Sequence, residues 1–403
     1  MKHMRSAQRT THLGWWLGAM TAMLSCLPVW ASSVFWFGVI EGVQQDKDGT
    51  ATISTLELAY GYRPEASHRL RNVKIAADVP IYLDWKRSTL AEALKPGRTY
   101  VFFTNHKQIT DPQGNPMSGP FTGSRGGGAL LVSTTPAPAH SVALSDPECR
   151  LLIATLDQPG DLASLSAAAP SKKACDARLV LALENGRIAS GFAWTTGLAG
   201  GAWHEADVSR LKFDGGSLAG DVKVKFSVAG GKSATGTYTL KGDAQGTGSF
   251  AGDLGEKKTS GKLSVLGLGV RRPGAEARLW MYTKDPRFGV EAGGTGWHSL
   301  VCGFAGGKGG AGWLCHEKGF ASGALADVSL NLADDKLSGG FTATDLKGAN
   351  RLKVTVAGRV YAGHLVAATL TFGEKGEALP AVGFLMDAGV APLVQPGSEK
   401  GAH

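Results

Sequence analysis

The sequence predicts an all-β protein, in which a small five-stranded N-terminal barrel with one short helix precedes two related β-sandwich or barrel-like repeat domains. Three observations predict this class. Helical periodicity is nearly absent from the 403 residues, short runs of alternating apolar and polar residues recur, and 57 glycines punctuate those runs. The clearest run, residues 221–228, places Val222, Val224 and Phe226 on one face and polar side chains on the other.

The first 31 residues have the three-part layout of a secretory signal peptide. Three basic residues precede an uncharged, mostly apolar stretch from 13 to 30, and Val29 and Ala31 occupy positions −3 and −1 of a cleavage site. We therefore expect residues 1–31 to be removed and the protein to be exported to the periplasm or the extracellular space. A retained membrane anchor and a lipoprotein lipidated at Cys26 are the alternatives.

Signal cleavage would remove three of the 42 Lys and Arg residues and none of the 34 Asp and Glu residues, which leaves a net charge of +5. A mildly basic chain favours contact with anionic polymers or membrane surfaces, but these charges are scattered and specify no partner. Export argues against nucleic acid as a ligand. The sequence contains no cofactor motif, and we expect no transmembrane span after cleavage.

Four cysteines follow the signal peptide, and they are Cys149, Cys175, Cys302 and Cys315. An even number in an oxidising compartment indicates two disulfides, and we expect the sequential pairs Cys149–Cys175 and Cys302–Cys315. The second pair flanks a glycine-rich turn at 305–310, where a hairpin would bring the two cysteines together.

The first domain is expected to extend from 34 to 133. Its five strand-like runs are 34–43, 51–59, 73–83, 98–104 and 129–133. Between the third and fourth runs, Ser88 or Thr89 can cap a short helix at 90–94, which Pro96 and Gly97 end.

Three strands, a helix and two further strands follow the order of an OB-type barrel. In this order the domain resembles the OB-type modules of exported proteins, including netrin-like ones, whose cysteines it lacks. The resemblance covers a quarter of the chain and concerns only the order of strands and helix. It therefore implies an OB-like topology and does not imply an activity.

Residues 134–176 are expected to form a linker, because this segment begins with Thr, Pro and Ala and later contains small and polar residues. Two β repeat domains are expected to follow at 177–270 and 271–391. Residues 392–403 are expected to form a flexible tail.

An internal repeat defines the two later domains. The matching segments are 206–209 with 326–329, 218–220 with 337–339, and 255–257 with 373–375. Their offsets are 120, 119 and 118 residues, and a nearly constant offset indicates duplication. Each copy has room for seven or eight strands.

No catalytic residue can be assigned from a motif. His204, Glu205 and Asp207 form the densest polar cluster, but the second repeat keeps only the aspartate, as Asp327. We therefore interpret Asp207 and Asp327 as structural turn residues that bond their own backbone.

Two further groups of residues, one of histidines and one mainly of basic residues, show no sequence motif of a functional site. His298, His316 and His364 lack the spacing of metal ligands, so no metal site is expected. A basic stretch between the second and third strands is interpreted as a solvated loop, with contact to an acidic glycan as the alternative. This stretch contains Arg63, His68, Arg69, Arg71 and Lys74.

Large aromatic residues are the better lead to a ligand site. Exposed Trp and Tyr rings can stack on sugars, although core packing explains most tryptophans of a β-protein. The candidate ligand-binding residues are Trp203, Trp280, Tyr282, Trp297 and Trp313.

These features favour an exported, non-enzymatic binding or structural protein of the cell envelope, with carbohydrate or another envelope component as its ligand. The first alternative is a secreted polysaccharide hydrolase or lyase. The second is a protein-partner module that acts through the OB-like domain. The oligomeric state stays open.

Overall fold

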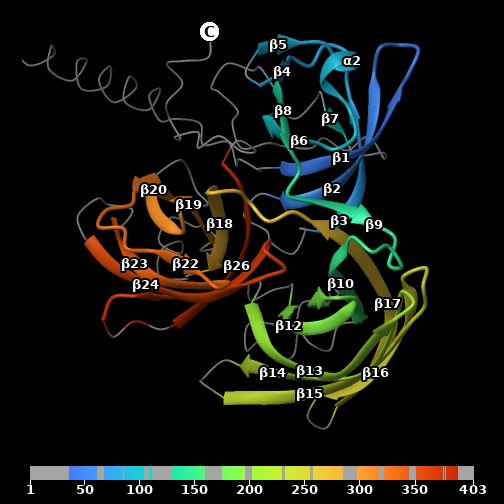
Figure 1. Ribbon diagram of the computed structural model, residues 1–403, viewed down its shortest axis with the longest axis vertical. Coiled ribbons are helices and arrows are strands. Elements are labelled where there is room, and N and C mark those ends of the chain that lie inside the picture. The colour runs from blue at the N-terminus through green and yellow to red at the C-terminus, as the bar shows by residue number, and fades with distance from the viewer. Residues whose placement is uncertain are drawn as a thin grey trace, which may run out of the picture. The chain divides into compact units, whose positions relative to one another are not determined.

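Three β-sheets make up nearly all regular structure in the computed structural model of the protein (Figure 1). The residues that the structure describes are 36–60, 68–84, 86–103, 109–110, 129–158, 175–195, 202–228, 232–254, 257–284, 297–316, 322–344, 351–374, 376 and 378–388. The all-β prediction is confirmed. Within the described residues, no helix has the length and apolarity that crossing a membrane requires.

The N-terminal domain is a mixed sheet with one short helix. Its elements are β1 (Trp36–Gln45), β2 (Ala51–Tyr60), β3 (Arg69–Ile75), β4 (Ile81–Leu83), β5 (Lys86–Ser88), α2 (Leu90–Ala93), β6 (Arg98–Phe103), β7 (Ile109–Thr110) and β8 (Ala129–Pro136). The strand order is β5-β4-β8-β6-β1-β2-β3-β7. Thr89 caps the helix as expected, because its hydroxyl accepts a hydrogen bond from the Glu92 N–H.

The pairing in this sheet follows the predicted OB-like order. Strands β1, β2 and β3 form a meander, β6 pairs with the other edge of β1, and β8 lies between β6 and β4. The pairing of β8 with β4 is parallel. The third predicted strand is divided into β3 and β4 by a turn that ends at Pro80, which has no N–H to donate to a ladder.

The second sheet closes on itself as an eight-stranded barrel, called barrel 1. Its strands are β10 (Cys149–Gln158), β11 (Cys175–Glu184), β12 (Arg187–Thr195), β13 (Ala202–Asp214), β14 (Ser217–Val228), β15 (Lys232–Gly242), β16 (Thr247–Leu254) and β17 (Lys257–Val270). Each strand pairs antiparallel with the next, and β17 pairs with β10 to close the barrel. Strand β9 (Ala139–Val142) adds to the edge of β17.

The third sheet closes in the same way as barrel 2. Its strands are β18 (Glu276–Lys284), β19 (Trp297–Ala305), β20 (Lys308–His316), β22 (Asn331–Ala333), β23 (Lys336–Thr344), β24 (Arg351–Tyr361), β25 (Leu365–Phe372) and β26 (Ala378–Asp387). The short strand β21 (Ser322–Ala324) pairs with β20, and β26 pairs with β18. The two barrels correspond strand for strand, with β21 and β22 together in the place of β13, and this confirms the predicted duplication.

The structure differs from the expected linker over residues 134–176. This segment contains β9 and β10, and β10 is the first strand of barrel 1. Its centre is buried on both faces, because Leu152 and Ala154 lie inside the barrel while Leu151 and Ile153 lie in a second core outside it. A strand of this kind shows a continuous apolar run and no alternation, so the pattern that predicted the other strands did not detect it.

That second core joins all three sheets, and we call it the shared core. Its members include Phe37 and Leu56 from the N-terminal sheet, Val180 and Phe192 from barrel 1, and Val382 and Phe384 from barrel 2. Strand β11 shows how the sequence builds it. Leu179 and Leu181 point into barrel 1, whereas Val180 and Ala182 point outward into the shared core.

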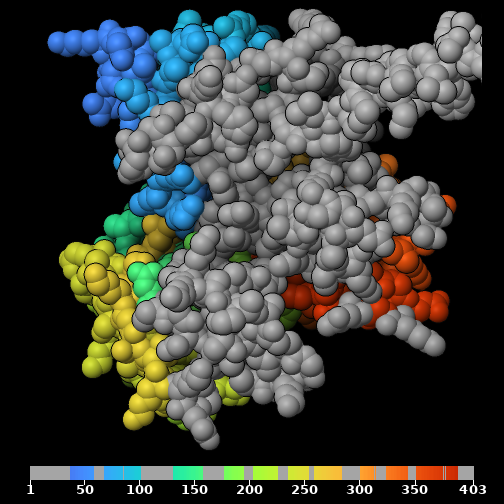
Figure 2. Space-filling model, turned by 180° about the vertical axis from the view of Figure 1, so that it is seen from behind, coloured from blue at the N-terminus to red at the C-terminus, as the bar shows by residue number. Residues whose placement is uncertain are grey.

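Another part of the barrel 1 exterior is polar. Lys241, Ser249 and Lys262 are exposed and form a cross-strand row on β15, β16 and β17. The outer surface of these strands is the yellow region of Figure 2. Barrel 1 therefore has two different outer faces, one apolar and packed in the shared core and one charged.

Candidate functional site

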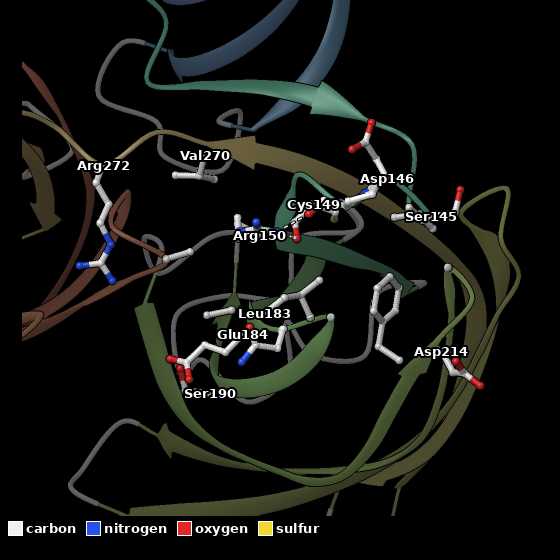
Figure 3. A pocket seen from close by; sticks show the side chains of 18 of the residues that line it. Ser145, Asp146, Cys149, Arg150, Leu183, Glu184, Ser190, Asp214, Val270 and Arg272 are labelled. Carbon is white, nitrogen blue, oxygen red and sulfur yellow. Dashed lines mark hydrogen bonds between the residues drawn. The ribbon is translucent and has the colours of Figure 1, made fainter.

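Hairpin turns of both barrels border a cleft of about 820 Å³ (Figure 3). Barrel 1 contributes the segment that leads into β10, the β11–β12 turn and the β13–β14 turn. Barrel 2 contributes Asp335, Arg359, Val360 and Ala362, the end of β17 supplies Val270, and the connection between β17 and β18 supplies Arg272. This volume lies within the range of ligand pockets, about 300–1,000 Å³.

Tight turns give two walls of the cleft their shape. Asn185 and Gly186 join β11 to β12 with φ angles of 51° and 73°, and Gly215 and Gly216 join β13 to β14 with 53° and 85°. Two central residues with positive φ are the signature of the hairpin turns that match strand twist. The Asn-Gly and Gly-Gly pairs were visible in the sequence, but their convergence depends on barrel closure.

Charged groups line the cleft, and two of the cations are already engaged. Arg272 forms a two-pronged contact with Asp335, at 3.4 Å and 3.0 Å, which ties the β17–β18 connection to barrel 2. Arg150 donates from Nη1 to the carbonyl oxygens of Pro147 and Cys149. Both guanidinium groups are thereby held in place at the cleft.

Other polar groups of the cleft remain available to a ligand. The carboxylates of Glu184 and Asp214 are on exposed residues, and neither makes a hydrogen bond or ion pair with any residue that the structure describes. Ser190 adds a hydroxyl to the same cleft (Figure 3). Phe213, which is half-buried, supplies an aromatic ring beside these groups.

The described aromatic candidates lie in or against the shared core and not in this cleft. Tyr282 is buried in the shared core, and Trp280 stacks between it and Phe384, with ring centroids 6.3 Å and 6.1 Å away. Trp203 on β13 donates from Nε1 to the Ala368 carbonyl on β25 at 2.6 Å, which links the two barrels. These three rings therefore pack the domains together. The side chains of Trp297 and Trp313 lie outside the described residues.

The cysteine pairings expected from the sequence do not form. Cys149 and Cys302 are free and buried. Cys175 is opposite Gln158 at the far end of β10 from Cys149, about 30 Å away at the rise of a strand. The hairpin does form, but its turn is tight, at Gly306 and Gly307, and the resulting register places Cys302 opposite Gly312 and Cys315 opposite Ser299. The side chains of Cys175 and Cys315 lie outside the described residues.

Burial keeps both free thiols protonated. It raises the pKa of Cys149, and it raises the pKa of Cys302 to about 11. A thiol with a raised pKa is a poor nucleophile near neutral pH. The structure therefore gives these two cysteines a packing role.

Denatured protein is expected to contain reactive thiols without any reducing agent. Alkylation in denaturant followed by peptide mass spectrometry should label Cys149 and Cys302 completely, because neither is cross-linked. The same treatment of the native protein should label both slowly, since both are buried. Full protection of either residue in denaturant would contradict the strand registers.

The two aspartates expected at turns occupy equivalent places in the two barrels. Asp207 accepts from the Ser209 N–H at 3.1 Å and from its hydroxyl at 2.6 Å, next to an irregularity in the β13–β14 register. These bonds lower the pKa of Asp207. Asp327 has a positive φ of 51° and accepts from the Thr342 hydroxyl at 2.9 Å. Both carboxylates therefore bond nearby groups of their own barrel.

The basic stretch between β2 and β3 is not a solvated loop where the structure describes it. Arg69 and Arg71 bond the two oxygens of the buried carboxylate of Glu57, at 3.0 Å and 3.1 Å, and His68 is only 3% exposed. Arg63 lies outside the described residues.

Two of the three histidines considered as metal ligands are paired in the sheet, and the third lies elsewhere. His298 and His316 are cross-strand neighbours on β19 and β20, but their side chains lie outside the described residues. His364 lies in the turn before β25, where its ring contacts that of His68. No three His, Cys, Asp or Glu side chains among the described residues are placed to share a metal ion.

Comparison with known proteins gives no family for this chain. No protein-family model matches it, and no curated protein does. Among solved structures, kievitone hydratase from Nectria haematococca is similar at 7% sequence identity, over 61% of this chain and 91% of that one, with a TM-score of 0.19. A score this low supports no conclusion about fold or function.

Proposed function

We propose that the protein is an exported, non-enzymatic binding protein whose cleft between the two barrels holds a carbohydrate or another polyhydroxylated component of the cell envelope. The observation that carries the proposal is the cleft itself, with its available carboxylates, serine hydroxyl and aromatic ring. Sugar hydroxyls both donate and accept hydrogen bonds, so a site for them needs acceptors such as carboxylates together with donors such as guanidinium groups. The export signal predicted in the first 31 residues supports an envelope location.

The structure supports binding in a further way. Glu184 and Asp214 are the last residues of β11 and β13, directly before hairpin turns, and Ser190 lies on β12. Arg272 and Arg150 already bond other groups of the protein, and groups oriented in this way lose less conformational freedom on binding. Phe213 offers an apolar surface to a ligand, and Glu184 and Asp214 offer acceptors for hydroxyl groups at separate places in the cleft.

Glu184→Gln is expected to weaken glycan binding about tenfold or more. A hydrogen bond to a charged group is worth about 1.5–3 kcal/mol, and the amide keeps the shape of the side chain while losing the charge. The ligand would first be selected on a glycan array with the purified protein, and affinities would then be measured by calorimetry.

Glu276→Gln is the matched control, because Glu276 is exposed on β18 and does not line the cleft. It should bind as the unchanged protein does. Absence of binding to every glycan would overturn the proposed ligand class. Release of shortened fragments from a bound polymer would favour a polysaccharide hydrolase or lyase instead.

A further inference from the structure

Two histidines from different domains meet inside the shared core. His68 precedes β3 of the N-terminal sheet, and His364 precedes β25 of barrel 2. Their Nε2 atoms are 3.1 Å apart, and the side chains are buried, with 3% and 0% of each residue exposed. The ring of Phe384 packs against both imidazoles. The two imidazoles therefore join the N-terminal domain to barrel 2 at a place that water does not reach.

The hydrogen bonds fix the proton positions when both rings are neutral. His364 Nδ1 lies 3.1 Å from the Leu385 carbonyl oxygen, which can only accept, so Nδ1 carries the proton. A neutral imidazole has one N–H, so His364 Nε2 must accept and His68 Nε2 must donate. His68 Nδ1 is then an unprotonated lone pair, and it has no hydrogen-bond partner among the described residues.

The charged neighbour of this pair is a cation. Arg178 on β11 of barrel 1 is buried, stacks on Trp194 at 5.6 Å and acts on His68 electrostatically. The Glu57 backbone carbonyl accepts from the His68 N–H at 2.5 Å, but the Glu57 carboxylate is occupied by Arg69 and Arg71. A proton added to either imidazole would therefore create a second buried positive charge beside Arg178, with the carboxylate on β2 already engaged.

Local turns present the two histidines to each other. His68 has a φ of 58°, and Ala362 in the turn before His364 has a φ of 50°. Ala362 and Gly363 form the hairpin turn between β24 and β25, so this turn of barrel 2 places His364 at the contact.

We propose that His68 and His364 form a proton-operated joint, which holds the N-terminal domain on barrel 2 while both rings are neutral and releases it in an acidic medium. Ala362 lies in the same turn and also lines the cleft, so release would alter the cleft wall. The joint itself depends only on the domain contact and does not require the proposed ligand.

The direction of the pH dependence follows from burial. Burial, the facing imidazole of His364 and Arg178 hold the pKa of His68 well below its usual value, and burial lowers the pKa of His364 to about 4. In the separated state both rings would be exposed to water and would titrate at about pH 6.5. The separated state then binds protons more strongly, so docking is complete above about pH 7 and weakens below about 6.5. The docking constant should fall about tenfold per pH unit for each histidine, and about a hundredfold for the pair.

Small-angle scattering of the purified protein between pH 7.5 and 4.5 tests the joint. The radius of gyration should increase reversibly as the pH falls below 6. A variant with His68→Gln and His364→Asn cannot be protonated at these positions, so any opening should be lost or move to lower pH. His140→Gln changes an imidazole that is outside the shared core, and its transition should match that of the unchanged protein.

Nitrogen NMR of the histidine rings of the unchanged protein provides a second test that needs no variant. At pH 7.5 the spectrum should show the proton on Nδ1 of His364 and on Nε2 of His68. An unchanged radius down to pH 4.5, or titration of either ring near pH 6.5 while the domains stay docked, would overturn the proposal. An increase in the radius on addition of a metal chelator at pH 7.5 would also overturn it, because the joint would then be a metal bridge.

Discussion

Phe384→Ala is expected to lower the free energy of unfolding by about 3–5 kcal/mol. Phe384 is 1% exposed, and its ring stacks on Phe37 of β1, with centroids 5.7 Å apart and planes 6° from parallel. It also stacks on Trp280 of β18. Truncation would therefore leave a cavity between the N-terminal sheet and barrel 2, and the cost contains both the lost burial and that cavity. Urea unfolding at equilibrium measures the loss.

Leu70→Ala is the matched control for this variant. Leu70 lies on β3 and is 56% exposed, so its truncation should change the free energy of unfolding by no more than about 0.5 kcal/mol. A loss below about 1 kcal/mol for Phe384→Ala would show that the shared core does not hold the domains together.

Gly220→Ala and Gly339→Ala are each expected to cost about 2–3 kcal/mol. The two glycines are equivalent positions of β14 and β23, with φ angles of 118° and 116°. A Cβ on Gly220 would collide with the carbonyl oxygen of Arg210, and one on Gly339 with that of Ser329. The backbone beside each glycine would have to move, at Arg210 in barrel 1 and at Ser329 in barrel 2. Thermal or chemical unfolding of the two single variants measures the cost.

Gly42→Ala is the control for these two substitutions. Gly42 on β1 has no positive φ, and a Cβ there would make ordinary contacts with Ser54. It should be tolerated with little change in stability. If Gly339→Ala were tolerated while Gly220→Ala was not, the two barrels would differ in the backbone at these glycines. The duplication would then not include this positive-φ position.

Local features of the sequence predicted much of the fold. The strand runs of the first domain and the Thr89 cap depend on side chains within a few residues of each other, and the structure contains them. The repeat was visible because both copies keep turn and corner residues such as Gly220 and Gly339 at a nearly constant offset. Alternation, caps and turn residues act over short distances, so a single sequence displays them.

Features that depend on distant pairing were not predictable in the same way. Whether the sheet forms a sandwich or a barrel depends on whether β10 pairs with β17. These two strands are the first and the last of barrel 1, so they are far apart in the sequence. The strand β10 itself was missed because it is buried on both faces. His68 looked like part of a solvated basic loop, since its burial arises only when a second domain packs over it.

The candidate site shows the same division. Turn signals such as Asn185-Gly186 are local, but the sequence does not indicate that this turn, Arg272 and Ala362 surround one cleft. The sequence indicates tryptophans as candidate sugar-binding residues. In the structure, however, Trp203 and Trp280 pack against the shared core between the domains. Composition cannot distinguish a ring that packs a domain interface from one that binds a sugar.

Hydrogen–deuterium exchange with and without the glycan selected on the array tests the central claim most directly. A ligand held between the barrels should slow exchange at the β11–β12 and β13–β14 turns of barrel 1 and, in the same experiment, at Arg359, Val360 and Ala362 of barrel 2. Protection confined to one barrel, or found on the charged outer face of β15–β17, would contradict a site built by both copies of the duplicated fold.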